Sequence, residues 1–348
     1  MEKLNVGIVG CGLIAKAKHI PACKRLKKIV DLRAVCDLNE RLAQETAKEF
    51  CIPKAYTDIS KMISDENLNV IDICVPPQAH APIALEAMKN GCHIIMEKPM
   101  ALSTIDCDKM ITASTKNNLK ICVIHNTLYH PPFIKARKMI ADGLIGDFVG
   151  MRIYLSTPRW DMIDLKDHWY HKLPGGVIGE TGPHISYMSL AFLKDITNVD
   201  IYAKKFLDNS WAPFDEFRIE LEGTNGFSSV GLSYTRNCWT ATVDIFGTES
   251  GLFLDLERMI LLQHNMKDLK YMSLAKASLG NIRETVFDSS YSALRVASGK
   301  QKIGTDIIIE KFMDCILNES PNPVTGEEGR ETVRVMEMIV RRLNEKYP

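Results

Sequence analysis

The sequence has no long apolar run, no excess charge of either sign and no closely paired cysteines, and each absence excludes a class of protein. No apolar run approaches the roughly 18 residues of a membrane-spanning helix. Lys plus Arg number 43, as do Asp plus Glu, so the formal net charge is +0. Because nucleic acids and membrane surfaces usually require a basic excess, we expect neither as a partner. A strand is predicted within a few residues of Met1, which leaves no room for a signal peptide and favours a cytoplasmic protein.

The ten cysteines form no C-x-x-C pair, and several lie in apolar runs such as "VIDICV" and "KICVIH". We therefore expect buried free thiols in a reducing compartment rather than disulfides. The histidines do not lie at metal-ligand spacings with cysteines or carboxylates, so no metal is expected. There is no internal repeat and no low-complexity tract.

A chain of 348 residues exceeds the span of one ordinary core, so two domains are expected, at residues 1–124 and 125–348. In the first, fully apolar strands alternate with helices, which predicts an α/β fold with a doubly wound parallel sheet buried on both faces. The expected strands are 3–10, 30–37, 69–76, 93–96 and 120–126, and the expected helices are 13–26, 39–50, 82–90 and 104–118.

Longer strands with partial alternation and short glycine turns such as "GTNG" dominate the second domain. They predict an α+β domain with a large, mostly antiparallel open sheet. The expected strands are 147–156, 199–207, 214–223, 226–235, 239–248 and 251–257, and the expected helices are 131–143, 304–318 and 327–346. The last two helices are free to pack back on the first domain.

The stretch "GIVGCGLIA" places Gly10, Gly12 and Ala15 between the first strand and the first helix. A pyrophosphate needs backbone N–H groups at a helix start and no Cβ in its way, so this spacing favours a dinucleotide site. Asp37 ends the next strand, where a carboxylate would bind ribose hydroxyls and repel a 2′-phosphate. NAD is therefore favoured over NADP. NADP remains an alternative, because Arg41 could turn towards a 2′-phosphate.

In "HIIMEKPMAL", Glu97 and Lys98 follow a buried strand directly and Pro99 follows them. Ligands of open α/β sheets bind beyond the carboxyl ends of the strands, so we expect this pair to face the cofactor crevice. The alternative is an ion pair whose role is only to stabilise the loop.

Three stretches, "GIVGCGLIA", "DICVPPQAHAPIALEAMKNGCHIIMEKPMA" and "PGGVIGETGPHIS", resemble the glucose–fructose oxidoreductase/inositol dehydrogenase (Gfo/Idh/MocA) family. The resemblance runs over nearly the whole chain. It implies a Rossmann domain, a second domain whose open sheet often forms dimers or tetramers, and NAD(P)-dependent oxidation or reduction of sugars, polyols or related cyclic substrates. It also implies that Lys98 is the active-site lysine and that Glu97 positions it. The family's Asp-x-x-x-His pair falls on Glu180 and His184, so the aspartate is replaced here by glutamate.

The residues around this pair carry their own chemistry. Pro183 lacks an N–H, which predicts that its helix begins at about Glu180 or later. The positive helix end would favour an ionised Glu180 and a neutral His184, as a general base requires. A hydrogen-bonded structural histidine is the alternative.

Further candidates surround these motifs. For the cofactor they are Cys11, Leu13, Ile14, Val75, Pro76, His80 and Asn126, with His80 and His125 also considered as pocket-lining or structural residues. For the substrate they are Tyr129 and, in the aromatic and charged loop 156–174, Arg159, Trp160, Asp161, His168, Trp169, Tyr170, His171 and Lys172.

The sequence thus predicts an NAD(P)-dependent dehydrogenase or reductase of a sugar or polyol. A non-catalytic NAD-binding regulator and an NAD-dependent glycosidase on the same fold remain as alternatives. Too few helices are predicted to cover both faces of the second sheet, and an exposed apolar face that large predicts a homodimer or homotetramer.

Overall fold

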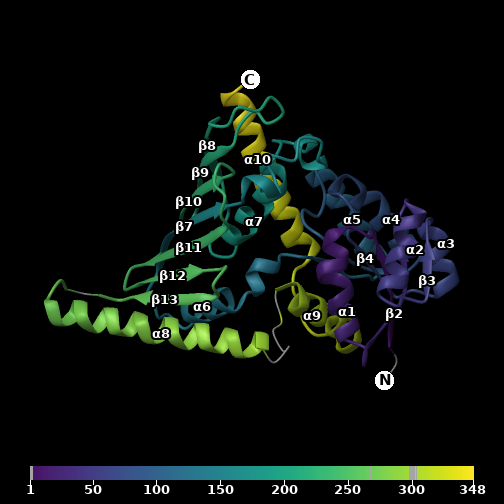
Figure 1. Ribbon diagram of the computed structural model, residues 1–348, viewed down its shortest axis with the longest axis horizontal. Helices are drawn as coiled ribbons and strands as arrows, with labels where there is room; N and C mark the ends of the chain where they lie inside the picture. Colours follow the sequence, from purple (N-terminus) through teal and green to yellow (C-terminus); the bar gives the residue numbers. More distant parts are fainter. Residues whose placement is uncertain (1–2, 267, 298–301, 303) are drawn as a thin grey trace. The chain divides into compact units, whose positions relative to one another are not determined.

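The computed structural model describes residues 3–266, 268–297, 302 and 304–348 (Figure 1). The chain divides into two compact units, the first made of Met1–Asn126 with Lys302–Arg334 and the second of Thr127–Gln301 with Val335–Pro348. Whether residues 1–124 and 125–348 fold as separate domains stays a prediction. No helix within the described ranges has the length and apolar content needed to cross a membrane.

Unit 1 is a six-stranded parallel sheet in the order β3-β2-β1-β4-β5-β6, which is the order of a Rossmann fold. The predicted doubly wound sheet is confirmed. The central strands are apolar because helices lie on both faces, and β4 and β6 are buried throughout. The strands are β1 Leu4–Val9, β2 Val30–Cys36, β3 Lys54–Tyr56, β4 Val70–Ile73, β5 His93–Met96 and β6 Ile121–Val123. The helices are η1 Ala15–His19, α1 Ile20–Arg25, α2 Glu40–Glu49, α3 Ile59–Glu66, η2 Pro77–Ala79, α4 His80–Lys89, α5 Thr104–Lys116 and α9 Gly304–Asn318.

Unit 2 is built on a seven-stranded sheet in the order β13-β12-β11-β7-β10-β9-β8. Only β7 and β10 pair in parallel, so the predicted mostly antiparallel sheet is confirmed. The strands are β7 Phe148–Ser156, β8 Asn198–Lys204, β9 Glu216–Gly223, β10 Gly226–Ser233, β11 Thr240–Gly247, β12 Gly251–Asp255 and β13 Ile260–His264. The helices are η3 Asn126–Tyr129, α6 Pro131–Ala141, η4 Arg159–Asp161, η5 Trp169–Lys172, α7 Ile178–Leu190, α8 Tyr271–Ala297 and α10 Gly326–Lys346; η3 and α10 each span a boundary between the units.

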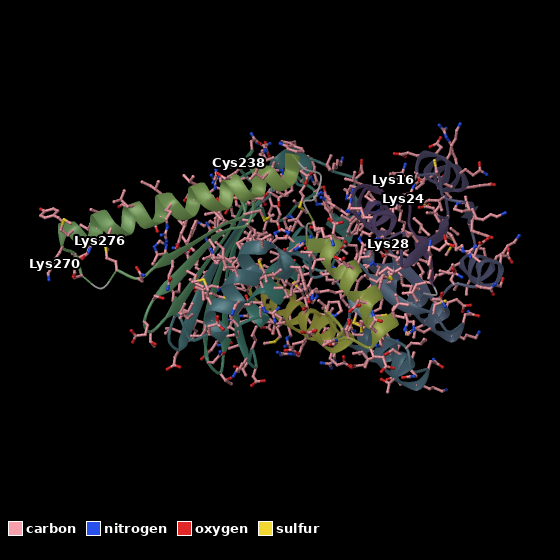
Figure 2. The ribbon with its side chains drawn as sticks, turned by 90° about the horizontal axis from the view of Figure 1, so that it is seen from below. Lys16, Lys24, Lys28, Cys238, Lys270 and Lys276 are labelled. Atoms are coloured by element: carbon pink, nitrogen blue, oxygen red, sulfur yellow. The ribbon has the colours of Figure 1, made fainter. Side chains whose placement is uncertain are left out.

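Helix α7 and the last turns of α10 lie on one face of this sheet (Figure 1). The two helices approach closely because Gly182 of α7 has no Cβ, which would lie 2.5 Å from the end of the Met336 side chain. Tyr347 lies just after α10, and its hydroxyl accepts the Ala203 N–H of β8 at 3.0 Å. Helix α8 lies along one side of the sheet next to β13, with Lys270 and Lys276 near its N-terminal end (Figure 2).

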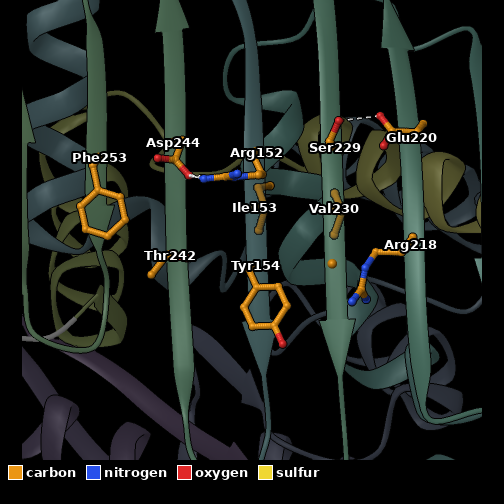
Figure 3. Close-up of a pocket in the computed structure, with 11 residues that line it drawn as sticks. Arg152, Ile153, Tyr154, Arg218, Glu220, Ser229, Val230, Thr242, Asp244 and Phe253 are labelled. Atoms are coloured by element: carbon orange, nitrogen blue, oxygen red, sulfur yellow. Dashed lines mark hydrogen bonds and ion pairs between the residues drawn. The ribbon is translucent and has the colours of Figure 1, made fainter. Parts of the chain in front are cut away.

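The opposite face of the sheet holds a shallow hollow of about 390 Å³. Figure 3 shows the rings of Tyr154 and Phe253 near the side chains of Arg152 and Asp244. Arg152 of β7 and Asp244 of β11 form an ion pair of 2.8 Å. Strand alternation turns charged side chains outward here among the aromatic ones, and whether this face forms an interface stays a prediction. The charged residues of the hollow are Arg152, Arg218, Glu220 and Asp244.

The predicted start of α7 is also wrong, since the helix begins at Ile178 and carries Pro183 inside it. Two turn-forming glycines with φ of +79° and +65°, Gly175 and Gly176, precede it. Its first turn is closed by bonds between residues three apart, from the Gly179 N–H to Gly176 and from the Glu180 N–H to Val177. These bonds do not need the N–H that proline lacks.

Candidate functional site

The glycine loop between β1 and η1 has the geometry that a dinucleotide site needs. Gly10 has a φ of +97°, and a Cβ there would lie 2.7 Å from backbone atoms of Cys74, so only glycine fits. Around Gly12 a Cβ would meet no atom within 4 Å, which leaves the backbone open to a close ligand. Ala15 is fully buried, as close packing of helix on strand requires.

Asp37 lies against this loop. One oxygen of its carboxylate accepts the Cys11 N–H at 2.9 Å, and the other accepts the Asn39 N–H at 2.9 Å. The carboxylate is therefore fixed at the end of β2, beside the residue between the two loop glycines. Arg41 is 86% exposed in its side chain and forms an ion pair with Glu45 at 2.7 Å. The residues present fit a dinucleotide whose ribose contacts Asp37.

The loop after β4 is held by His80. Its side chain is fully buried, with its two ring nitrogens 2.9 Å from the carbonyl oxygens of Val75 and Pro99. Burial lowers the pKa of His80, so a neutral ring donates to one of these carbonyls. His80 thereby joins the Val75–Pro76 loop to the segment that follows Lys98, which is a structural role beside the predicted cofactor contact.

Glu97 and Lys98 follow β5 at the carboxyl end of the sheet, as predicted, and the Lys98–Pro99 peptide bond is cis. One Glu97 oxygen accepts the Lys98 N–H at 3.2 Å, and the other lies 3.0 Å from Nε2 of His19. Burial alone would raise the pKa of Glu97. The hydrogen bond and charge of His19, together with Lys98, outweigh burial and lower that pKa below its usual value.

His19 and Asp72 are functional candidates that the sequence did not reveal. His19 ends η1, and its Nδ1 lies 2.9 Å from both oxygens of Asp72 in the middle of β4. Both side chains are fully buried. The one available signal was the carboxylate in "VIDICV", because a charged group inside an apolar strand needs a buried partner.

In unit 2, Glu180 and His184 lie on α7, Glu180 in its first turn. The Nδ1 of His184 lies 2.5 Å from the Tyr187 hydroxyl, which in turn lies 2.7 Å from the hydroxyl of Thr127. This series of hydrogen bonds can fix the tautomer of the His184 imidazole. If the proton lies on Nδ1 and is donated to Tyr187, Nε2 carries a lone pair.

The predicted loop 156–174 contains two short helical turns, η4 and η5, with Tyr170 of η5 buried. The rings of His168 and Tyr170 lie 4.1 Å apart, and the Tyr170 hydroxyl donates to the carbonyl of Met162 at 2.7 Å. Burial, and then the charge of Glu180, raises the pKa of Asp161. The structure therefore brings Asp161 within electrostatic reach of Glu180.

The remaining candidates vary in exposure. Leu13 is 86% exposed and Trp160 60%, whereas His125 is buried with a pKa lowered by burial to about 3. Partly exposed candidates are Val75, Asn126, Tyr129, Arg159, Trp169 and His171, and the exposed ones include Ile14, Pro76, Arg41 and Lys172. Their contacts with a cofactor or substrate stay predictions, as does a shared role for Lys98 of unit 1 and His184 of unit 2.

Comparisons with known proteins find related sequences and solved structures of the same fold. A levoglucosan dehydrogenase from Pseudarthrobacter phenanthrenivorans is 30% identical over 209 residues, which are 58% of this chain and 54% of that protein. An alpha-N-acetylgalactosaminidase from Shewanella oneidensis is 24% identical over 264 residues, which are 68% of this chain and 56% of that protein. The chain thus spans little more than half the length of these two relatives. A solved structure of levoglucosan dehydrogenase in complex with NADH and L-sorbose has the same fold, with a TM-score of 0.81 at 19% identity over 99% of this chain and 98% of that one.

Two family descriptions match the chain in its two parts. Residues 4–125 match the oxidoreductase family with an NAD-binding Rossmann fold, and residues 133–253 match the C-terminal domain of the same Gfo/Idh/MocA family. Together the two matches span well over half of the sequence. The chain therefore belongs to the Gfo/Idh/MocA family of oxidoreductases.

Proposed function

We propose that this protein is an NAD-dependent oxidoreductase that interconverts a secondary alcohol and a ketone on a sugar, polyol or related cyclic substrate. The observation that carries the proposal is the pairing, within unit 1, of an open glycine loop beside Asp37 with a charged Glu97–Lys98 strand end. The first is suited to a dinucleotide, and the second to an oxygen on which negative charge develops.

The cofactor would be held by the loop of Gly10 to Ile14 and by Asp37. The nicotinamide, when bound, supplies the hydride chemistry. A carboxylate that already accepts two backbone N–H groups is fixed in place and would repel a 2′-phosphate, so NADH should bind more tightly than NADPH. Fluorescence titration of the chain with each nucleotide tests this, and tighter binding of NADPH would refute it.

In the direction of oxidation, Lys98 would donate a hydrogen bond to the substrate hydroxyl oxygen and stabilise the charge that builds there. His184 would accept the alcohol proton on Nε2, provided that its Nδ1 proton is donated to Tyr187. Glu180 replaces an aspartate, and its longer side chain would orient the substrate or the imidazole. In the direction of reduction, the same groups would return the proton.

The N-acetylgalactosaminidase relative keeps a second function open, in which the substrate is oxidised only transiently and a glycosidic bond is cleaved. A screen of the full chain with NAD distinguishes the two. Incubation with a panel that includes levoglucosan, L-sorbose and aryl glycosides should give NADH and ketone in equal amounts for a dehydrogenase. Sugar release without net NADH would support the glycosidase. The absence of both NADH and released sugar would support a regulator.

We also propose that the open face of the unit 2 sheet mediates self-association. Its hollow combines aromatic side chains with paired charges, a mixture suited to a specific interface. Light scattering should report a dimer or a larger assembly, and a monomer at micromolar concentration would refute the proposal.

A further inference from the structure

The buried histidine of unit 1 stands between two carboxylates. Nδ1 of His19 lies 2.9 Å from both oxygens of Asp72, and Nε2 lies 3.0 Å from an oxygen of Glu97. The His19 and Asp72 side chains are fully buried, and that of Glu97 is 13% exposed. Three elements that are distant in sequence, η1, β4 and the end of β5, supply these groups.

These distances constrain the protons of the cluster. A neutral imidazole carries one N–H, so its other nitrogen would present a lone pair to a carboxylate oxygen at hydrogen-bond distance. An imidazolium donates a hydrogen bond from each nitrogen, so no lone pair faces and repels a carboxylate oxygen. The Cys74 thiol lies 3.7 Å from Asp72 and burial raises its pKa, so it stays a neutral donor.

We propose that His19 is a fixed imidazolium that holds Glu97 charged and oriented beside Lys98, and so acts as a positioning residue for Lys98. This rests on the proposed function, in which Lys98 contacts the substrate oxygen. With both carboxylates ionised, His19 and Lys98 balance Asp72 and Glu97, so the four groups carry no net charge. His19 also lies within the helical segment that follows the glycine loop, η1 and then α1, and therefore links the dinucleotide loop to the lysine.

The other titratable groups near Glu97 cannot replace His19. His80 from α4 and His125 after β6 lie within electrostatic reach of Glu97, and burial lowers the pKa of both. Cys74 from β4 stays neutral, as does Cys23 from α1, whose pKa burial also raises. Without His19, the charge and N–H of Lys98 would be left to oppose the burial that raises the pKa of Glu97.

A bound metal is the rival explanation. Among the described residues, His19, Asp72 and Cys74 offer ligand atoms within 4.8 Å of one another. A zinc ion would require a deprotonated thiol and an unprotonated Nδ1. The hydrogen-bond distances from Nδ1 of His19 to Asp72 and from Nε2 to Glu97, which occupy both ring nitrogens, favour the imidazolium instead.

The test uses NMR of the full chain without substrate, so its result does not depend on the proposed activity. In ¹⁵N-histidine-labelled wild type, both nitrogens of His19 should remain protonated well above the reference histidine pKa of about 6.5. His93, whose pKa burial lowers, should be neutral there and serves as the internal control. A neutral His19 at that pH, or one equivalent of tightly bound zinc per chain, would overturn the proposal.

The link to Glu97 is tested with ¹³C-labelled glutamate, using Glu97→Gln to assign the signal. In wild type the Glu97 carboxylate should titrate below the reference value of about 4.3, and in His19→Leu it should titrate at a higher pH than in wild type, because the hydrogen bond and charge of His19 are lost. His93→Gln, at the other end of β5, should leave it unchanged. If His19→Leu does not fold, His19→Gln takes its place, because one amide cannot supply the charge. An unchanged Glu97 titration in the folded variant would contradict the positioning role.

Discussion

Gly12 offers a substitution that should separate folding from cofactor binding. An added Cβ at this position would meet no atom within 4 Å, and the residue is not in the left-handed region of φ. Replacing glycine by alanine at such a site usually stabilises a protein by about 0.4–1 kcal/mol, because the unfolded chain loses freedom. Gly12→Ala should therefore unfold at a slightly higher urea concentration than wild type.

The affinity of Gly12→Ala for NADH should fall, whereas its stability rises. If the pyrophosphate approaches this backbone closely, the Cβ occupies its place and at least one N–H bond to a charged group is lost, worth about 1.5–3 kcal/mol. At about 1.4 kcal/mol per factor of ten, NADH affinity should fall by about ten- to a hundredfold. Calorimetric titration with NADH measures this change.

Gly10→Ala is the matched control. Its φ of +97° and the backbone of Cys74 at 2.7 Å make alanine strained there, so both stability and affinity should fall. Wild-type affinity in a stably folded Gly12→Ala would refute the placement of the pyrophosphate on this loop.

Other expectations follow from the same structure. Lys98→Met should bind NADH normally but lower kcat by about 10²–10³, with little change in KM, and an unaltered kcat in the NADH assay would make this lysine structural. Asp37→Ser should narrow the preference for NADH over NADPH in the fluorescence titration. The pKa of His19 is raised and that of Glu97 is lowered, so both charged groups stabilise the folded state fully between about pH 4.3 and 6.5. The urea stability lost in His19→Leu should therefore be greatest in that range. The loss should shrink in stronger acid and as the pH rises through the folded pKa of His19. Tyr154→Asp, in the sheet hollow, should shift light scattering towards monomer, whereas Phe206→Asp, exposed outside that hollow, should not.

Much of unit 1 could be predicted because its signals are local. The strand before Gly10 and the apolar strand before Glu97 are each bounded by residues whose chemistry marks an end. Short elements escaped prediction. Strand β3 has three residues and α3 has eight, so each is shorter than the window over which a hydrophobic period is identified.

Helix α8 was missed for a different physical reason. Its small and polar residues Ser273, Ala277 and Gly280 are partly buried, whereas Met272 and Ile282 are exposed. Its hydrophobic period therefore does not identify the face turned towards the protein, and a Gly within the helix weakens the local signal further. The helix lies against β13, and this contact is not signalled by an amphipathic pattern in its sequence.

The His19 cluster shows why a site can be only half visible in sequence. Lys98 and the glycine loop were found because each sits in a contiguous motif. His19 and Glu97 are 78 residues apart and Asp72 lies between them, and they meet only because β4 pairs with both β1 and β5. A parallel sheet with crossover helices brings such groups together through an order of strands that differs from their order in the chain. The buried carboxylate of Asp72 signals that a cationic partner must exist, but only the strand order identifies it as the histidine at the end of η1.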